Sequence, residues 1–424
     1  MKTEENKWVN LNKLVLLYCQ DFLILGTGAE LIFANELTQS DIKTVYSDED
    51  CKSLIIAYFN AANEKDWDTF MKYVCQEDYN YFVNYFADTS EKNGIKQLDS
   101  VNVSDLYKID ESEASQYFIT DEYDVLAAGN TYSYVAEINC STETENQYFI
   151  DGYNYILMVL AEENNELKVV QVNKPNTELL EKYVINNVEA EAECYEAKQA
   201  GINAIEECDN GRLVGADGEL ITEGFEIVTA EIADSDSDIN PASRSYNKLS
   251  HYTTYSYPSS IRVKLNKTGN NVITRVDFST YMKCVLPNEW YASWNTESLK
   301  AGAFCVKMVG IYRAINPISS AGGYDLTQGT QYYVPNSQNA TTNAVIDSIV
   351  NLGMADSAGI LFFPEYAAGT SGSTGTKASG QLKQWGSQKL AQSGYSYKQI
   401  LNYYYSGSCY SSGDVNLFGY SIGY

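Results

Sequence analysis

Apolar residues in the first half of the chain follow helical spacing and then change to strand-like runs. Trp67, Phe70, Met71 and Val74 stand at i, i+3, i+4 and i+7, which predicts an amphipathic helix after a break at residues 63–66. Three strand-like runs follow, at Thr131–Cys140, Gln147–Leu160 and Leu167–Val172. Asn164–Asn165 supplies the turn between the last two runs. Helices followed by a curved antiparallel sheet predict an α+β domain over residues 50–175.

A second pattern begins near Pro258 and combines short strands with amphipathic helices. Alternation over residues 261–265 predicts one strand, and Val272–Tyr281 and Ile360–Phe363 predict two more. Capping residues and periodicity predict helices at residues 295–315, Asn339–Leu352, Gln381–Gln392 and Ser396–Tyr405. The expected fold class is therefore α+β with two domains, the second a mixed α/β domain over residues 257–410 that is followed by a tail, residues 411–424.

Residues 176–256, between the two predicted domains, form a helical and acidic linker region by their composition. Residues 234–240 place acidic and amide side chains at every second position, as a calcium-binding loop does. Ile239 stands where that loop requires glycine, and Ser245 where it requires glutamate. We therefore interpret this stretch as a solvated run of charge.

Residues 1–34 resemble a signal peptide. Lysines precede the apolar run Leu14–Leu25, and small residues favour cleavage near Ala34. Gln20 and Asp21 interrupt the apolar run, so a cytoplasmic amphipathic start is the alternative. The run is too short for a membrane span. We expect an exported protein, at the cell surface or extracellular, with no stable membrane span after signal removal.

Charge is distributed unevenly along a chain whose net charge is −27. Residues 1–250 carry 17 Lys and Arg against 48 Asp and Glu, whereas residues 251–424 carry 12 against 8. So acidic a first half argues against a nucleic-acid partner. The slightly basic second half is compatible with an anionic polymer, although the acidic residues could equally serve only to keep the first half soluble.

Cysteine and histidine usage narrows the possible chemistry. The nine Cys residues form no CxxC pair, which argues against a zinc ribbon or a thioredoxin-like site. The one His, His251, excludes most histidine-based metal sites and makes a Ser-His-Asp or Cys-His device improbable unless it is itself the base. We expect no metal and no cofactor.

Glu289 is the strongest candidate for an active-site residue. The stretch Tyr281–Ala303 is interpreted as a strand, a tight turn and a helix, with Glu289 in the turn between Pro287 and Trp290. Rigid and aromatic neighbours that shield a carboxyl from water raise its pKa, which suits a general acid. The alternative is that Glu289 only caps the helix that follows.

Two resemblances to known families cover most of the chain. The run IIAYFNAANEKDWDTFMKYV resembles the opening of nuclear transport factor two-like domains, which implies a cone-shaped α+β fold for residues 50–175. Residues 258–408 resemble the stage II sporulation protein D/LytB amidase-enhancer domain. Four blocks in the family's order carry this second resemblance: YMKCVLPNEWYASWNTESLKAGAFCVKMVGIYR, YDLTQGTQYYVPNSQNATTNAVIDS, FFPEYAAGTSGSTG and QWGSQKLAQSGYSYKQILNYYYSGS.

The second resemblance implies a peptidoglycan lytic transglycosylase. Such enzymes cut the MurNAc–GlcNAc bond without water and leave a 1,6-anhydro sugar, in cell-wall remodelling or sporulation. Glu289 is then the single acid/base. Lys300 and Lys307 would stabilise charge or hold the substrate, or would be ordinary exposed helix charges. Tyr366, Gln384 and Trp385 would bond or stack on sugars, although Trp385 could instead line the core or a cleft wall.

The sequence departs from the family at its zinc-binding positions. Many members carry a Cys/His pattern near the Tyr-Asp-Leu block, whereas residues 327–332 contain neither residue type, and Ala378 stands near a position that is often His. Zinc is therefore not expected. The second hypothesis for function is a non-catalytic peptidoglycan-binding protein or an amidase enhancer. The expected partners are peptidoglycan glycan strands and a cell-wall amidase.

Overall fold

The structure is a computed structural model, and it describes residues 45–421 apart from several gaps. Those gaps are at 91, 118–122, 124, 127–129, 189–193, 210–211, 222–224, 228, 231–255 and 268–269. The predicted signal peptide, the calcium-like run and His251 lie outside the described residues. Residues Thr44–Tyr424 form one compact unit.

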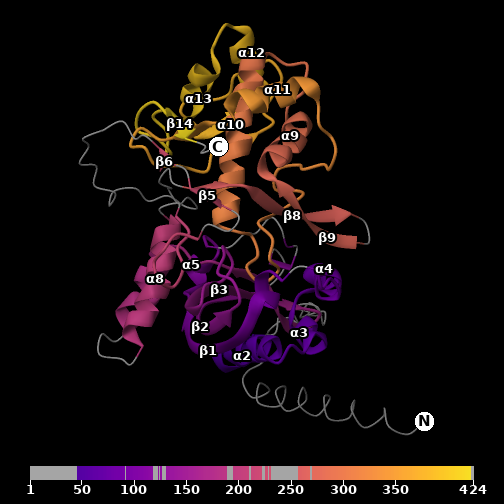
Figure 1. Ribbon diagram of the computed structural model, residues 1–424, viewed down its shortest axis with the longest axis vertical. Helices are drawn as coiled ribbons and strands as arrows, with labels where there is room; N and C mark the ends of the chain where they lie inside the picture. Colours follow the sequence, from indigo (N-terminus) through magenta and orange to yellow (C-terminus); the bar gives the residue numbers. More distant parts are fainter. Residues whose placement is uncertain are drawn as a thin grey trace, which may run out of the picture. The chain divides into compact units, whose positions relative to one another are not determined.

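A four-stranded antiparallel sheet forms the centre of the first half (Figure 1). Its order is β1-β2-β3-β4, with β1 at Leu98–Lys108, β2 at Thr131–Thr142, β3 at Gly152–Glu163 and β4 at Glu166–Asn173. Asn164 and Asn165 have φ values of 55° and 63°, so they form the predicted tight turn between β3 and β4. The strands predicted at Thr131–Cys140 and Leu167–Val172 are confirmed. The strand predicted over Gln147–Leu160 begins only at Gly152, and β1 was not predicted. The resemblance to nuclear transport factor two-like domains stays a prediction.

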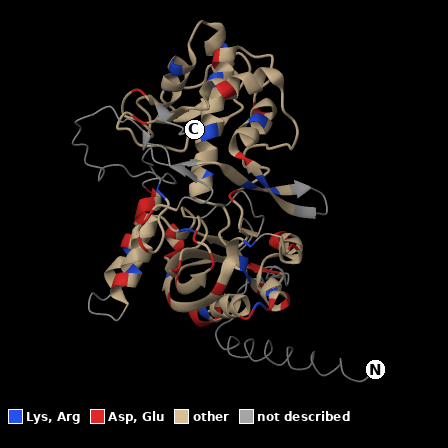
Figure 2. Cartoon of the chain, viewed as in Figure 1, with Lys and Arg blue, Asp and Glu red and all other residues tan. Residues whose placement is uncertain are grey.

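Helices pack against both faces of this sheet. The Ser47 capping box begins α2, and α2 contacts β1 while α8 contacts β3. The bounds are α2 Asp48–Asn63, α3 Trp67–Tyr73, α4 Gln76–Ala87, α5 Glu111–Ala114, α7 Thr177–Tyr183 and α8 Tyr195–Asp209. Short 3₁₀ turns lie at Gly94–Gln97 and Ile185–Asn187. Acidic side chains are denser along α8 and around this sheet than along the helices of the second half (Figure 2).

Small sheets and five helices make up the described second half. One sheet has the order β10-β8-β9, with β8 at Ser260–Lys267, β9 at Asn270–Asp277 and β10 at Leu326–Thr327. The other pairings are β11 (Leu352–Ala355) with β14 (Asn416–Ser421) and β6 (Thr229–Ala230), β12 (Glu365–Ala367) with β13 (Gln381–Lys383), and β5 (Phe225–Ile227) with β7 (Ser256–Pro258). The helices are α9 Phe278–Glu289, α10 Thr296–Ile315, α11 Ala340–Ile349, α12 Gln384–Gln392 and α13 Tyr397–Tyr405.

The predicted strand over Val272–Tyr281 is partly wrong. β9 ends at Asp277, whose carboxylate accepts a hydrogen bond of 2.7 Å from Thr280 N and so caps α9. Phe278, Tyr281 and Val285 are buried at helical spacing, a period that the β-forming side chains of this stretch concealed. Of the remaining predicted elements, α10 and α13 are confirmed almost to the residue.

The two halves share one buried hydrophobic cluster, and the predicted division into two domains is not confirmed. Residues 318–325 of the second half are held by the first half through backbone hydrogen bonds. Ile95 N donates to Ala321 O, and Ser320 N donates to Val172 O, each at 2.9 Å. A Cβ on Gly94, whose φ is 56°, would lie 2.5 Å from Ala321 O, so only glycine permits this approach.

Buried polar groups also join the halves. Lys264 Nζ of β8 lies 2.7 Å from Asp78 Oδ1 of α4, and each residue is only 7 % exposed. Tyr148 Oη donates to Asp325 Oδ1 at 2.7 Å, while Arg262 N donates to Asp325 Oδ2 at 2.7 Å. Burial raises the pKa of Asp325 to about 6 despite these donors. Separating the halves would therefore expose charged groups as well as apolar surface.

Candidate active site

Glu289 is the last residue of α9 and not part of a turn between a strand and a helix. Pro287 stands in the final turn of α9, and Trp290 N closes the helix by donating to Leu286 O at 2.9 Å. Trp290 then leaves the helix in an extended conformation. Because one side of the last helical turn is packed and the other is open, the Glu289 side chain is partly buried.

The Trp290 ring fixes the end of α9 against α10 and α12. It is 1 % exposed, and a Cβ on Gly302 of α10 would lie 2.5 Å from a ring carbon. Trp290 Nε1 also donates to Ser387 Oγ of α12 at 3.3 Å. Only glycine at position 302 lets α10 approach the Trp290 ring this closely. The Trp290 ring, next to Glu289, is therefore held in a single position.

The parallel pair β12 and β13 brings two predicted site residues to Glu289. Tyr366 lies in β12 opposite Leu382 of β13, and Gln384 begins α12 directly after β13. Gln384 Nε2 donates to Glu289 Oε2 at 2.8 Å, and Tyr366 lowers the pKa of the same carboxyl as a hydrogen-bond donor does. Residues separated by about 80 to 95 positions in sequence thus converge on one side chain.

The surroundings of Glu289 favour its protonated form without preventing ionisation. Burial raises the pKa of Glu289, while the hydrogen bonds from Gln384 and Tyr366 oppose that rise. Burial likewise raises the pKa of Tyr366 well above its usual value, so this phenol stays protonated and able to donate. A carboxyl with these neighbours can release a proton and remain hydrogen-bonded as a carboxylate.

Three aromatic rings lie close together on residues that are near Glu289 and Gln384 in sequence. We use the name aromatic platform for Tyr291, Trp294 and Trp385, whose ring centroids are 5.3, 5.8 and 4.7 Å apart in pairs. Tyr291 is 61 % exposed, so the platform faces solvent. Trp385 N donates to Ala368 O at 3.0 Å, which fixes the start of a loop rich in Gly, Ser and Thr at residues 368–375.

Neither predicted lysine belongs to this constellation. Lys300 Nζ lies 3.6 Å from Glu297 Oε1 and 5.4 Å from the Tyr397 ring centroid. Lys307 is 0 % exposed and donates to carbonyl oxygens at the end of α11, including Val350 O at 2.6 Å. Burial also lowers the pKa of Lys307 well below its usual value. A fully buried amino group that binds backbone carbonyls cannot reach a glycan, which argues against the predicted substrate role of Lys307.

A segment in the second half of the chain also matches a known family model. Residues 266–352 match the SpoIID family model, stage II sporulation protein. No curated protein matches the chain. The predicted resemblance is thereby confirmed for these residues, and the matched SpoIID segment includes Glu289, Trp294 and the helices α9 to α11.

Residues outside the SpoIID segment complete the site. Tyr366, Gln384 and Trp385 follow its end at residue 352 and reach Glu289 through β12, β13 and α12. Sequence reasoning also missed Tyr281 and Gln331, which are buried behind Tyr366 and bonded to each other. Both lie in blocks that carry the resemblance, but nothing in their types or spacing indicates that they meet.

The zinc site of many SpoIID-like proteins has no counterpart in the residues described here. Residues 327–332 contain neither Cys nor His, so this block does not fit a zinc ion. Within the described ranges, no group of three or more His, Cys, Asp or Glu side chains is placed to hold a metal.

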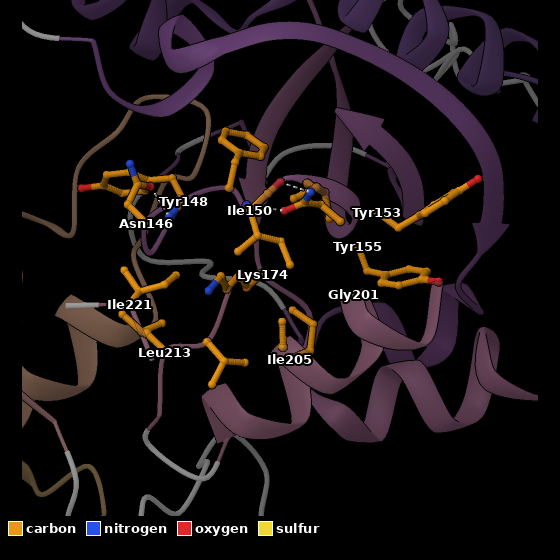
Figure 3. Close-up of a pocket in the computed structure, with 15 residues that line it drawn as sticks. Asn146, Tyr148, Ile150, Tyr153, Tyr155, Lys174, Gly201, Ile205, Leu213 and Ile221 are labelled. Atoms are coloured by element: carbon orange, nitrogen blue, oxygen red, sulfur yellow. Dashed lines mark hydrogen bonds between the residues drawn. The ribbon is translucent and has the colours of Figure 1, made fainter. Parts of the chain in front are cut away.

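A hollow elsewhere is too small to be a second substrate site. Figure 3 shows Lys174, Ile205 and Ile221 around it, and its lining residues all precede residue 222. Its volume of about 20 Å³ suffices for one water molecule.

Among the described helices, none is long and apolar enough to cross a bilayer.

Proposed function

We propose that this protein is a peptidoglycan lytic transglycosylase in which Glu289 is the acid and the base. The SpoIID match suggests a cell-wall-related function in sporulation. The observation that carries the finer proposal is a single partly buried carboxyl whose pKa is raised by burial, bonded to Gln384 and Tyr366 beside an exposed aromatic platform.

One carboxyl suffices for this reaction. Protonated Glu289 gives its proton to the oxygen that bridges MurNAc and GlcNAc, and the bond from that oxygen to C1 of MurNAc breaks. The 6-hydroxyl oxygen of the same MurNAc forms the new bond to C1, and its proton returns to Glu289. No water is consumed. A hydrolase would need a second carboxyl as nucleophile or base.

The contacts of Glu289 suit both halves of that cycle. Burial favours the protonated carboxyl that the first transfer needs. Once the proton has left, Gln384 Nε2 and Tyr366 Oη donate to the carboxylate and stabilise it until the 6-hydroxyl proton arrives. Donors that are already in place need no rearrangement as charge develops.

The aromatic platform gives the glycan strand a surface on which to lie. Sugar rings present apolar C–H faces that pack on aromatic side chains, and Trp385 was predicted for this role. Trp385 directly follows Gln384, and Tyr291 is two residues from Glu289, so a sugar on the platform is next to the proposed acid. Lys300 is not needed in this scheme.

The test is digestion of purified glycan strands, with mass analysis of the products. Wild type should release 1,6-anhydro muropeptides, and Glu289→Gln should be slower by at least about 100-fold, the usual effect of removing an acid/base. Glu297→Gln is the matched control, because Glu297 belongs to the neighbouring α10 and pairs with Lys300.

Equal product release from wild type and Glu289→Gln would overturn the proposed chemistry. If neither protein releases products while both bind sacculi or stimulate an amidase, a wall-binding or amidase-enhancing function replaces it.

A further inference from the structure

A buried chain of hydrogen bonds leads to Glu289 from behind. Tyr281 Oη of α9 donates to Gln331 Oε1 at 2.6 Å, and Gln331 Nε2 donates to Tyr366 Oη at 3.2 Å. Tyr366 in turn acts on Glu289 and lowers the pKa of its carboxyl in the way that a hydrogen-bond donor does. Tyr281 is 0 % exposed and Gln331 is 1 % exposed, so water does not compete for these bonds. Three elements of the fold meet in this chain: α9, the segment after β10, and β12.

The direction of each bond follows from the orientation of the Gln331 amide. An amide oxygen can only accept, and an amide nitrogen can only donate. Tyr281 Oη donates to Gln331 Oε1, so Gln331 Nε2 faces Tyr366. Gln331 Nε2 then donates to a lone pair of Tyr366 Oη. The single phenolic proton of Tyr366 is then left for Glu289. Were the amide of Gln331 reversed, that proton would go to Gln331 instead.

We propose that Gln331 is a positioning residue, which holds Tyr366 as a hydrogen-bond donor to Glu289 with Tyr281 as its anchor. This inference rests on the acid/base role proposed for Glu289. It assigns a task to two buried residues that do not touch substrate. It also gives a reason for burying a polar side chain as large as Gln331 between Tyr281 and Tyr366.

The groups around Glu289 make its protonation sensitive to this chain. Gln384 approaches from α12 and Tyr366 from β12, and Tyr281 on α9 feels the charge of Glu289. Arg313 and Asp325 also act on Tyr281, with opposite effects on its pKa. With burial as the dominant influence on Glu289, the loss of one donor shifts its protonation toward the acid form.

Two substitutions test the chain. Tyr366→Phe keeps the ring and removes the donor. Gln331→Glu keeps the shape but offers oxygen where the amide donates, so the Tyr366 proton turns away from Glu289. We expect both to move the protonation midpoint of Glu289 upward by about one pH unit, since a hydrogen bond to a charged group changes an ionisation equilibrium by about tenfold.

The readout is the infrared carboxyl band that is lost in Glu289→Gln, followed through a pH titration of the full-length protein. It requires no turnover, so it remains informative if the transglycosylase proposal fails. Tyr405→Phe is the control: it loses a buried hydroxyl that donates to Glu365 O at 2.8 Å, next to Tyr366, without entering the chain.

In the active enzyme, the alkaline limb of the pH–rate profile should move with the infrared midpoint. An unchanged midpoint in Tyr366→Phe would show that Tyr366 does not donate to Glu289. An unchanged midpoint in Gln331→Glu alone would remove Gln331 from the chain. If Gln331→Glu does not fold, Tyr281→Phe takes its place, because it frees the Gln331 amide and should shift the midpoint in the same direction. A shift of similar size in Tyr405→Phe would reduce the whole effect to packing.

Discussion

The ion pair between Asp78 and Lys264 provides a direct test of whether the two halves of the chain fold together. It joins α4 to β8, and Lys264 Nζ also lies 4.7 Å from the Tyr81 ring centroid and 5.0 Å from that of Tyr324. Although burial alone would lower it, Asp78 raises the pKa of Lys264 above its usual value. The lysine is therefore charged at neutral pH, and its contribution to stability is lost as pH rises through its raised pKa.

Lys264→Met removes the cation and leaves the carboxylate of Asp78 buried. Breaking a buried pair in this way costs about 3–5 kcal/mol. Tyr123 Oη still donates to Asp78 Oδ2 at 3.1 Å, so the lower end, about 3 kcal/mol, is expected. At about 2 °C for each kcal/mol in a large domain, the melting temperature should fall by about 6 °C. The double variant with Asp78→Asn should recover part of this loss, because no buried charge remains.

The assay is urea and thermal unfolding, combined with hydrogen exchange followed by mass spectrometry. If the shared core unites the halves, Lys264→Met should lower the protection of β3 and of α10 together, in one transition. The reasoning that residues 44–424 are one folding unit would be refuted by two separate unfolding transitions, of which Lys264→Met shifts only one. A loss below about 1 kcal/mol would show that the pair contributes no more than an exposed salt bridge.

Three further predictions concern the site. Lys307→Met should destabilise the protein by about 1–3 kcal/mol in urea unfolding without raising KM, whereas a substrate-binding lysine would raise KM. Gly302→Ala should cost about 1–3 kcal/mol and alter the fluorescence of the overpacked Trp290, while Gly329→Ala, which has space for its Cβ, should do neither. Glu289→Gln should be more stable than wild type, by a margin that grows as pH rises from the unfolded pKa through the raised folded pKa and vanishes in acid, in thermal melts across pH. An equal margin at all pH values would contradict the raised pKa.

Local signals predicted much of the fold, and pairings between distant segments account for the rest. Asn295 and Ser396 are recognisable caps, and α10 and α13 follow them as expected. The cap at Asp277 was overlooked because Val, Tyr and Cys residues around it favour strands. The shared core could not be predicted, since the approach of Gly94 to residues 318–325 depends on tertiary packing.

The site shows the same limit. Glu289, Tyr366 and Gln384 were named from sequence and do converge, but the reason is the parallel pairing of β12 and β13, which three-residue strands do not reveal. Lys307 stands on a helix that is buried on nearly every side, so helical spacing offered no exposed face on which to place it. Gln331 looks like an ordinary polar loop residue until its two tyrosine partners are known.

The position of Glu289 at the end of α9 has an electrostatic consequence. The aligned peptide dipoles of a helix leave partial negative charge at its C-terminus, and a carboxylate there is disfavoured by about 0.3–1 kcal/mol. The backbone of α9 therefore acts in the same direction as burial and favours a neutral carboxyl. Asp277 caps the other end, where its negative charge is favourable. The register in which this helix begins and ends thus helps to set the strength of the acid at its last residue.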